Sequence, residues 1–153
     1  IKGALILDDS YNASPASMKL ALETLKGIPK YTADRRKIAV LGDMLELGQY
    51  STEAHQAVGN MVGEFVDYLF CVGERAKFIA DAAANQMLLD HIFTFHSSDD
   101  AKKKVQEILK QGDVVLIKGS QGMRMEKIVS EIMAHPERKS ELLVRQSKRW
   151  LAK

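Results

Sequence analysis

Five short apolar runs, each followed by a polar turn and then a helical pattern, constrain the fold of this chain more than any other feature. The runs are residues 4–7, 38–41, 68–72, 92–95 and 114–117. The runs are almost continuously apolar rather than alternating, with Thr94 as an exception, which is typical of strands that are covered on both faces. Strands that alternate with helices in this way build a parallel sheet with right-handed crossovers. We therefore expect an α/β, Rossmann-like doubly wound sheet of about five parallel strands, with one extra antiparallel edge strand as an option.

The segments between the runs have the spacing of helices with one buried face. After the first run, Ser14 is placed to cap a helix whose first residue is Pro15, because a proline loses no hydrogen bond there. The apolar face of this helix is formed by Met18, Ala21, Leu22 and Leu25. Ser51 is expected to cap the helix that follows the second run.

The charge of the chain is unevenly distributed along its 153 residues. Residues 136–153 hold six Lys or Arg and two Glu, a net charge of +4, which leaves −2 for residues 1–135 out of a total of +2. We expect residues 1–135 to form one folded domain that does not bind nucleic acid. Residues 136–153 are expected to be a basic tail, either helical or disordered, that could serve as an interaction arm.

Cysteine content and hydropathy indicate where the protein works. Cys71 is the single cysteine, so a disulfide framework is impossible and a buried thiol in a reducing compartment is expected. No apolar stretch approaches the roughly 20 residues of a membrane span. The chain begins with Ile1 just before a strand, and we expect it to be a fragment of a longer protein.

The turns that follow the runs gather polar side chains, because the carboxyl ends of parallel strands share one edge of a sheet. The polar set comprises Asp8, Asp9, Tyr11, Asn12, Asp43, Glu46, Glu74, Arg75, His96, Lys118, Ser120 and Arg124. Carboxylates accept hydrogen bonds from ribose hydroxyls. The Asn side chain both donates hydrogen bonds to amide groups and accepts them, and the Tyr ring stacks on bases. The turn at 118–120 offers backbone N–H groups beside a cation, which suits a carboxylate or phosphate, although a serine N-cap explains it too.

Motifs for phosphate and metal binding are missing from the sequence. No P-loop is present, no Gly-x-Gly-x-x-Gly follows the first run, and the four His are scattered. Asp8 and Asp9 could hold Mg²⁺, but one pair of adjacent acids is weak evidence. Adjacent residues at a strand end point to opposite faces, so we expect one of them to face a ligand and the other to orient the loop. We assign no catalytic residue and no metal ligand.

Four stretches resemble the C-terminal domain of the Mur ligase family, in the order and spacing of that family. They are DDSYNASPASM at 8–18, GDMLELG at 42–48, AHQAVG at 54–59 and KGSQGMRME at 118–126. The resemblance covers residues 4 to about 133 and is strongest to the member that adds D-alanyl-D-alanine. Two positions depart from the family, which usually has Asn in place of Ser14 and Arg in place of Gln121.

The resemblance implies an ATP-dependent, amide-forming ligase of peptidoglycan precursor synthesis in the bacterial cytoplasm. ATP would convert the terminal carboxylate of UDP-MurNAc-tripeptide into an acyl phosphate, which the amine of D-Ala-D-Ala would attack. The family's N-terminal and central domains, absent here, would carry the UDP-sugar site, the P-loop and Mg²⁺. This domain would close over ATP and position the dipeptide, and would be inactive alone.

The same resemblance assigns roles to individual residues. The expected ATP contacts are Asp9, nearest the ribose, Tyr11 and Asn12. The expected dipeptide contacts are Lys118, Ser120, Arg124, which could pair with the dipeptide carboxylate, and Glu74 and Arg75. The expected loop-shaping residues are Asp43, Glu46 and His55. For His55 alone, an interdomain role and a purely structural role also remain open.

Two other functions remain open from the residues alone. A stand-alone Rossmann-type nucleotide-binding module would bind ATP tightly without partner domains. A non-catalytic interaction domain would instead bind an acidic partner through residues 136–153, with strong salt dependence.

Overall fold

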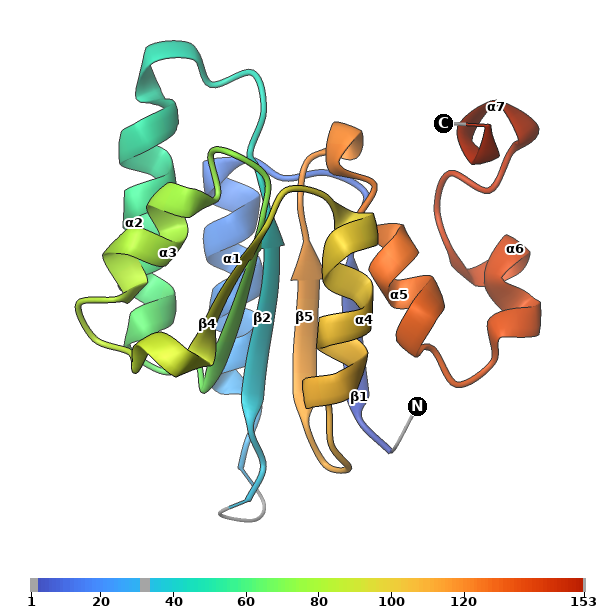
Figure 1. Cartoon of the computed structure of the whole chain (residues 1–153), viewed down its shortest axis with the longest axis horizontal. Coiled ribbons are helices and arrows are strands. Elements are labelled where there is room, and N and C mark those ends of the chain that lie inside the picture. The colour runs from blue at the N-terminus through green and yellow to red at the C-terminus, as the bar shows by residue number, and fades with distance from the viewer. Residues whose placement is uncertain (1–2, 31–33, 153) are drawn as a thin grey trace.

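Strand and helix alternate through the domain in a computed structural model that describes residues 3–30 and 34–152 (Figure 1). The strands are β1 (Leu5–Asp9), β2 (Lys37–Gly42), β3 (Tyr68–Val72), β4 (Ile92–Phe95) and β5 (Val114–Lys118). The helices are α1 (Pro15–Gly27), α2 (Ser51–Gly63), α3 (Lys77–Ala83), α4 (Ser98–Ile108), α5 (Glu126–Ile132), α6 (Lys139–Leu142) and α7 (Lys148–Leu151). Short 3₁₀ turns lie at Gly48–Tyr50, Leu89–His91, Gln121–Met123 and Pro136–Arg138.

All five strands run parallel in one sheet with the order β1-β5-β2-β3-β4. The last strand, β5, is inserted between β1 and β2, so Leu116 of β5 pairs with Leu7 on one side and Ala39 on the other. The predicted doubly wound parallel sheet is confirmed. Within residues 3–30 and 34–152, no antiparallel edge strand is added to it. This order brings the turns after β1, β5 and β2 next to one another.

Both faces of the sheet are covered, and each face has its own apolar core. Ala39 and Leu41 of β2 face the core formed with α1, α2 and α3, whereas Ile38 and Val40 face the core formed with α4 and α5. Figure 1 shows the two layers of helices on opposite sides of the strands. This double burial explains why the runs that form the central strands are apolar at every position.

The start of α1 follows the sequence prediction. The Ser14 hydroxyl accepts the Ser17 N–H at 3.1 Å, the Ser17 hydroxyl accepts the Ser14 N–H at 2.9 Å, and Pro15 is the first helical residue. These bonds satisfy two backbone donors at the helix end and fix the direction in which the chain leaves the preceding turn.

The predicted N-cap at Ser51 is wrong. The 3₁₀ turn Gly48–Tyr50 leads straight into α2, so Tyr50 occupies the cap position and Ser51 is already helical. A capping serine needs extended backbone angles, and the preceding turn of helix does not allow them here.

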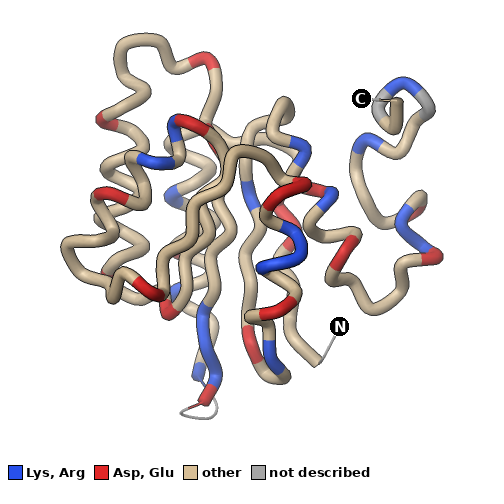
Figure 2. Tube along the Cα trace, viewed as in Figure 1, with Lys and Arg blue, Asp and Glu red and all other residues tan. Residues whose placement is uncertain are grey.

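Residues 136–152 fold back beside α5 as short helical turns (Figure 1). Leu143 is 7% exposed and joins the core of α4 and α5, and Arg145 is 8% exposed. Figure 2 shows Lys and Arg interspersed with Asp and Glu over the whole trace. None of the helices in the described part of the chain combines the length and apolar composition that a membrane crossing requires.

Cys71 lies in β3 with its thiol fully buried in the core of α1, α2 and α3. Burial raises the pKa of this thiol well above its ordinary value, since the apolar surroundings disfavour the thiolate. The prediction of a buried cysteine is confirmed.

Helices α2 and α3 are packed closely together at Gly59. A Cβ atom there would lie 2.3 Å from the Ile79 carbonyl oxygen and 2.6 Å from the Ala82 Cβ. Gly59→Ala should therefore lower the free energy of unfolding by about 1–3 kcal/mol, although alanine favours helix formation. Urea unfolding of the chain, followed by circular dichroism, measures this loss.

Gly27, the last residue of α1, provides the matched control. No atom lies within 4 Å of its Cβ position, so Gly27→Ala should keep or raise stability, by up to about 1 kcal/mol. Equal unfolding midpoints for the two variants would contradict the close packing at Gly59.

Candidate functional site

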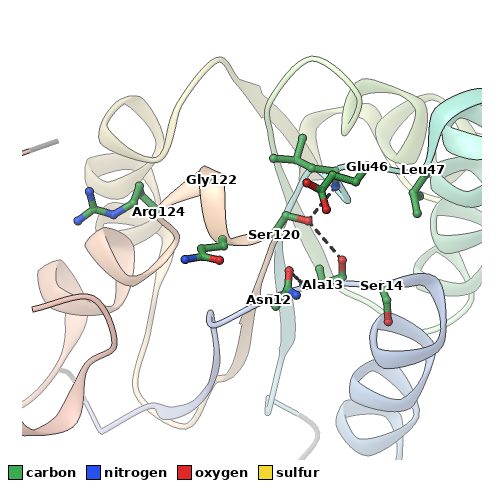
Figure 3. A pocket seen from close by; sticks show the side chains of 10 residues that line it. Asn12, Ala13, Ser14, Glu46, Leu47, Ser120, Gly122 and Arg124 are labelled. Atoms are coloured by element: carbon green, nitrogen blue, oxygen red, sulfur yellow. Dashed lines mark hydrogen bonds between the residues drawn. The ribbon is translucent and has the colours of Figure 1, made fainter. Parts of the chain in front are cut away.

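The turns after β1, β2 and β5 enclose a hollow of about 720 Å³, which we call the turn pocket (Figure 3). Its lining residues are Asn12, Ala13, Ser14, Leu45, Glu46, Leu47, Ser120, Gln121, Gly122 and Arg124. The pocket lies at the carboxyl ends of the strands, beside the point where β5 separates β1 from β2. Open α/β sheets bind their ligands at such positions.

Ser120 connects the three turns of the pocket. Its hydroxyl accepts the Leu45 N–H at 2.8 Å and donates to the Ala13 carbonyl at 3.3 Å. Its backbone N–H donates to the Asp43 carbonyl at 2.9 Å. Because Ser120 is only 4% exposed, these bonds are shielded from water and fix the floor of the pocket.

Lys118 is buried under the turn that follows β1. Its ammonium lies 2.8 Å from Asp9 Oδ2 and 2.9 Å from the Asn12 carbonyl oxygen, and the residue is 2% exposed. The sequence assigns Lys118 to the dipeptide side, whereas the structure places it outside the pocket lining because β5 pairs with β1 and sets Lys118 opposite Asp9. The Asp9 side chain remains 48% exposed and can still accept bonds from a ligand.

Asp8 and Asp9 have different hydrogen-bond partners. Asp8 Oδ1 accepts the Ser10 backbone N–H at 3.1 Å and the Ser10 hydroxyl at 2.5 Å, so Asp8 orients the turn. Across the described ranges, no group of three or more His, Cys, Asp or Glu is arranged to hold a metal ion.

Asp43 fixes the neighbouring loop after β3. It is 3% exposed, and its Oδ1 accepts the Ala76 N–H at 2.7 Å. A Cβ at Gly73, where φ is +111°, would lie 2.4 Å from Asp43 Oδ1, so this close approach requires glycine. Glu74 and Arg75 are exposed on this loop and lie outside the lining of the turn pocket, with Arg75 Nη1 at 3.7 Å from Asp43 Oδ2.

His55 joins α2 to the turn after β2. The ring is fully buried, Nε2 accepts the Met44 N–H at 3.0 Å, and Nδ1 lies 2.6 Å from the Ser51 carbonyl oxygen. These partners assign the proton to Nδ1 and the lone pair to Nε2. Of the three roles that the sequence leaves open for His55, this geometry favours fixing the loop.

Arg124 and Glu46 occupy the two sides of the turn pocket, with Ser120 between them (Figure 3). The Glu46 side chain is exposed, whereas Arg124 is 9% exposed and its Nε donates to Glu126 Oε1 at 2.5 Å. The Arg124 guanidinium points away from Asn12 and Ser120, so the Arg124 backbone and the base of its side chain form the pocket wall.

Backbone strain is concentrated around this site. Three non-glycine residues of the described chain have left-handed φ angles: Glu46 at +64°, Arg124 at +54° and Arg145 at +58°. The conformation costs about 1–2 kcal/mol for a residue with a Cβ atom. Two of the three line the turn pocket, and the third contacts the turn after β1 and Glu126.

Sequence reasoning assigned no role to Glu126 or Arg145. Glu126 is 1% exposed and binds both Arg124 and Arg145, and Arg145 also donates to the carbonyls of Ser10 and Tyr11. Glu126 stands within a stretch that resembles the family, which could have drawn attention to it. Arg145 looks like one more charge of a basic tail, and no sequence pattern distinguishes it.

Comparison with known proteins identifies relatives over most of the chain. The family described as Mur ligase, glutamate ligase domain, matches residues 1–121. The UDP-N-acetylmuramoyl-tripeptide–D-alanyl-D-alanine ligase of Bacillus subtilis is 35% identical over 135 residues, which are 88% of this chain and 29% of that protein.

Solved structures agree with this match. The crystal structure of MurF ligase from Thermotoga maritima in complex with ADP has a TM-score of 0.70 at 30% identity and covers 90% of this chain and 30% of its own. Crystal structure II of MurF from Acinetobacter baumannii has a TM-score of 0.71 at 28% identity, covering 87% and 29%. The chain spans less than a third of the length of these relatives.

Loss of the Ser120 hydroxyl tests whether it holds the three turns together. Ser120→Ala leaves the partly buried Leu45 N–H without its acceptor, which should lower the free energy of unfolding by about 1–3 kcal/mol. Ser130→Ala, at a partly buried position on α5, should change it by less than about 0.5 kcal/mol. Urea unfolding of both variants gives the difference, and a Ser120→Ala protein as stable as Ser130→Ala would disprove the role of Ser120.

Proposed function

The chain belongs to the Mur ligase family through its glutamate ligase domain, and on this premise we propose that it is the C-terminal part of an ATP-dependent ligase that adds D-alanyl-D-alanine to UDP-N-acetylmuramoyl-tripeptide. One observation carries the proposal. The turn pocket is lined by residues from three of the stretches that resemble the family, 8–18, 42–48 and 118–126, and Ser120 joins all three.

The nucleotide side is the turn after β1. Tyr11 is 64% exposed and its ring lies 5.5 Å from the Arg145 guanidinium, an arrangement that supports one face and allows a base to stack on the other. Asp9 keeps a half-exposed carboxylate for a ribose hydroxyl, and Asn12 Oδ1 holds the turn by accepting the Ala13 N–H at 2.9 Å. These groups fit a nucleoside, in line with the relative that was crystallised in complex with ADP.

The dipeptide side is the turn pocket itself. D-Ala-D-Ala carries an ammonium at one end and a carboxylate at the other, and the pocket has the exposed Glu46 on one side and Arg124 on the opposite side. Arg124, Glu126 and Arg145 together carry one net positive charge, which is only weakly screened because all three are buried. The Glu46 carboxylate on one side, and the net positive charge behind the wall that Arg124 forms on the other side, would orient a zwitterionic dipeptide.

The remaining parts of the reaction belong to the rest of the parent protein. The sequence has no P-loop, and the described residues offer no metal cluster, so we assign the ATP phosphates, Mg²⁺ and the UDP-sugar to the parent's other domains. This domain contributes by orienting the incoming amine and excluding water when it closes over ATP. It supplies no acid–base residue, and we place the reaction in the bacterial cytoplasm.

Two variants of the full-length parent test the two sides separately, with phosphate release as the readout. The assay supplies UDP-MurNAc-tripeptide, ATP, Mg²⁺ and D-Ala-D-Ala. Asp9→Asn keeps a hydrogen-bond acceptor for Lys118 but removes the charge, and should raise KM for ATP about three- to tenfold. Glu46→Gln should raise KM for the dipeptide by a similar factor, about three- to tenfold, and leave KM for ATP unchanged.

Matched controls are two exposed acids that do not line the turn pocket. Asp90→Asn lies just before β4 at the opposite edge of the sheet, and Glu53→Gln lies on the first turn of α2. Both controls should keep the wild-type constants. If Asp9→Asn and Glu46→Gln raised both KM values equally, or neither, the separation into a nucleotide side and a dipeptide side would be incorrect.

A further inference from the structure

Arg145 contacts the turn after β1, although the two are more than 130 residues apart in the sequence. Leu143 anchors the segment that carries Arg145 in the core of α4 and α5. Arg145 then turns inward and is 8% exposed. The family match ends at residue 121, so it does not include this contact.

The Arg145 guanidinium binds two consecutive backbone carbonyls of the turn. Nη1 donates to the Ser10 carbonyl oxygen at 2.9 Å, and Nη2 donates to the Tyr11 carbonyl oxygen. The guanidinium also lies against the Tyr11 ring, with Cζ at 5.5 Å from its centroid. A planar fork with several donors can hold two carbonyls at once, which a lysine ammonium on a flexible stem does less well.

Glu126 connects this contact to the dipeptide side. Its Oε2 accepts from Arg145 Nη1 at 3.0 Å, and its Oε1 accepts from Arg124 Nε at 2.5 Å. The carboxylate is 1% exposed, so each guanidinium compensates a charge that would be costly to bury alone. One buried carboxylate therefore links the wall of the turn pocket to the turn that carries Tyr11.

The backbone at Arg145 supports a specific role for its side chain. A left-handed φ of +58° suits glycine, and a residue with a Cβ holds it only when its surroundings enforce it. Here the strained angle directs the guanidinium to Ser10, Tyr11 and Glu126. The hydrogen bonds of the Arg145 side chain offset the conformational free energy that the left-handed backbone costs.

We propose that Arg145 is a positioning residue for ATP binding, an inference that rests on the function proposed above. Its planar guanidinium fixes the positions of the Ser10 and Tyr11 carbonyl groups. It thereby fixes the orientation of the Tyr11 ring on which the base stacks. Through Glu126 it also holds Arg124 in place, so the nucleotide side and the dipeptide side are fixed relative to each other. Arg145 itself touches neither substrate.

The test compares Arg145→Gln and Arg145→Lys in the full-length parent. The control is Arg138→Gln, which removes a charge from the same segment but breaks only an exposed pair with Glu141 at 3.2 Å. The first readout is amide hydrogen exchange by mass spectrometry. Arg145→Gln should speed exchange at residues 10–13 about tenfold and leave α2 and α3 unchanged, because a hydrogen bond to a charged group is lost locally.

The second readout separates KM from kcat in the phosphate-release assay. Arg145→Gln should raise KM for ATP about three- to tenfold, with kcat within about twofold and an unchanged KM for UDP-MurNAc-tripeptide. Arg145→Lys keeps the charge and a single donor nitrogen in place of the planar guanidinium, and should therefore raise KM for ATP less than Arg145→Gln does. If Arg145→Gln does not fold, the same two readouts are measured on Arg145→Lys instead.

The outcomes distinguish this inference from the proposed function. A wild-type parent that shows no dipeptide-dependent phosphate release overturns the proposed function and, with it, the role in ATP binding. A working parent in which Arg145→Gln leaves KM for ATP unchanged overturns the role of Arg145 alone. Faster exchange throughout the domain, or the same effect from Arg138→Gln, would show general destabilisation and also overturn it.

Discussion

The site depends on one buried cation, the ammonium of Lys118. An ammonium that is 2% exposed is costly unless its hydrogen bonds are made, and here Asp9 and the Asn12 carbonyl supply them. The turn after β1 must therefore lie over the end of β5. Two residues further on, Ser120 binds both this turn and the turn after β2. The insertion of β5 between β1 and β2 makes both contacts possible.

Buried and exposed groups of the site have different roles in the proposed ligase. The buried groups Lys118, Ser120 and Asp43 hold the turns, and the exposed groups Tyr11 and Glu46 remain available to ligands. Backbone strain at Glu46, Arg124 and Arg145 is confined to the same region. Such a preformed surface positions substrates at little entropic cost when the rest of the enzyme closes on it.

The fold could be predicted from the sequence because its signals are local. Continuous apolar runs predicted the covered strands, and Ser14 with Pro15 predicted the start of α1. The Ser51 cap was wrong because a 3₁₀ turn precedes it, and such a turn has no strong sequence pattern. The gathering of polar residues at one sheet edge followed from the parallel strand order.

The details of the site could not be predicted because they depend on contacts between distant segments. Lys118 is buried because β5 pairs with β1, more than 100 residues away in the sequence. Helical periodicity says nothing about Arg124, which lies in a left-handed turn before α5 and whose side chain turns toward Glu126. The inward turn of Arg145 depends on how residues 143–146 pack on the finished domain.

The most direct test of the central claim is the dipeptide dependence of phosphate release by the full-length parent. With UDP-MurNAc-tripeptide, ATP and Mg²⁺ present, the account predicts sustained release only when D-Ala-D-Ala is added. It also predicts a higher KM when the carboxylate of the dipeptide is replaced by an amide, because the net positive charge beside the turn pocket attracts a neutral amide less strongly than a carboxylate. Sustained release at the same rate without any dipeptide would contradict the assignment of this domain to a D-alanyl-D-alanine-adding ligase.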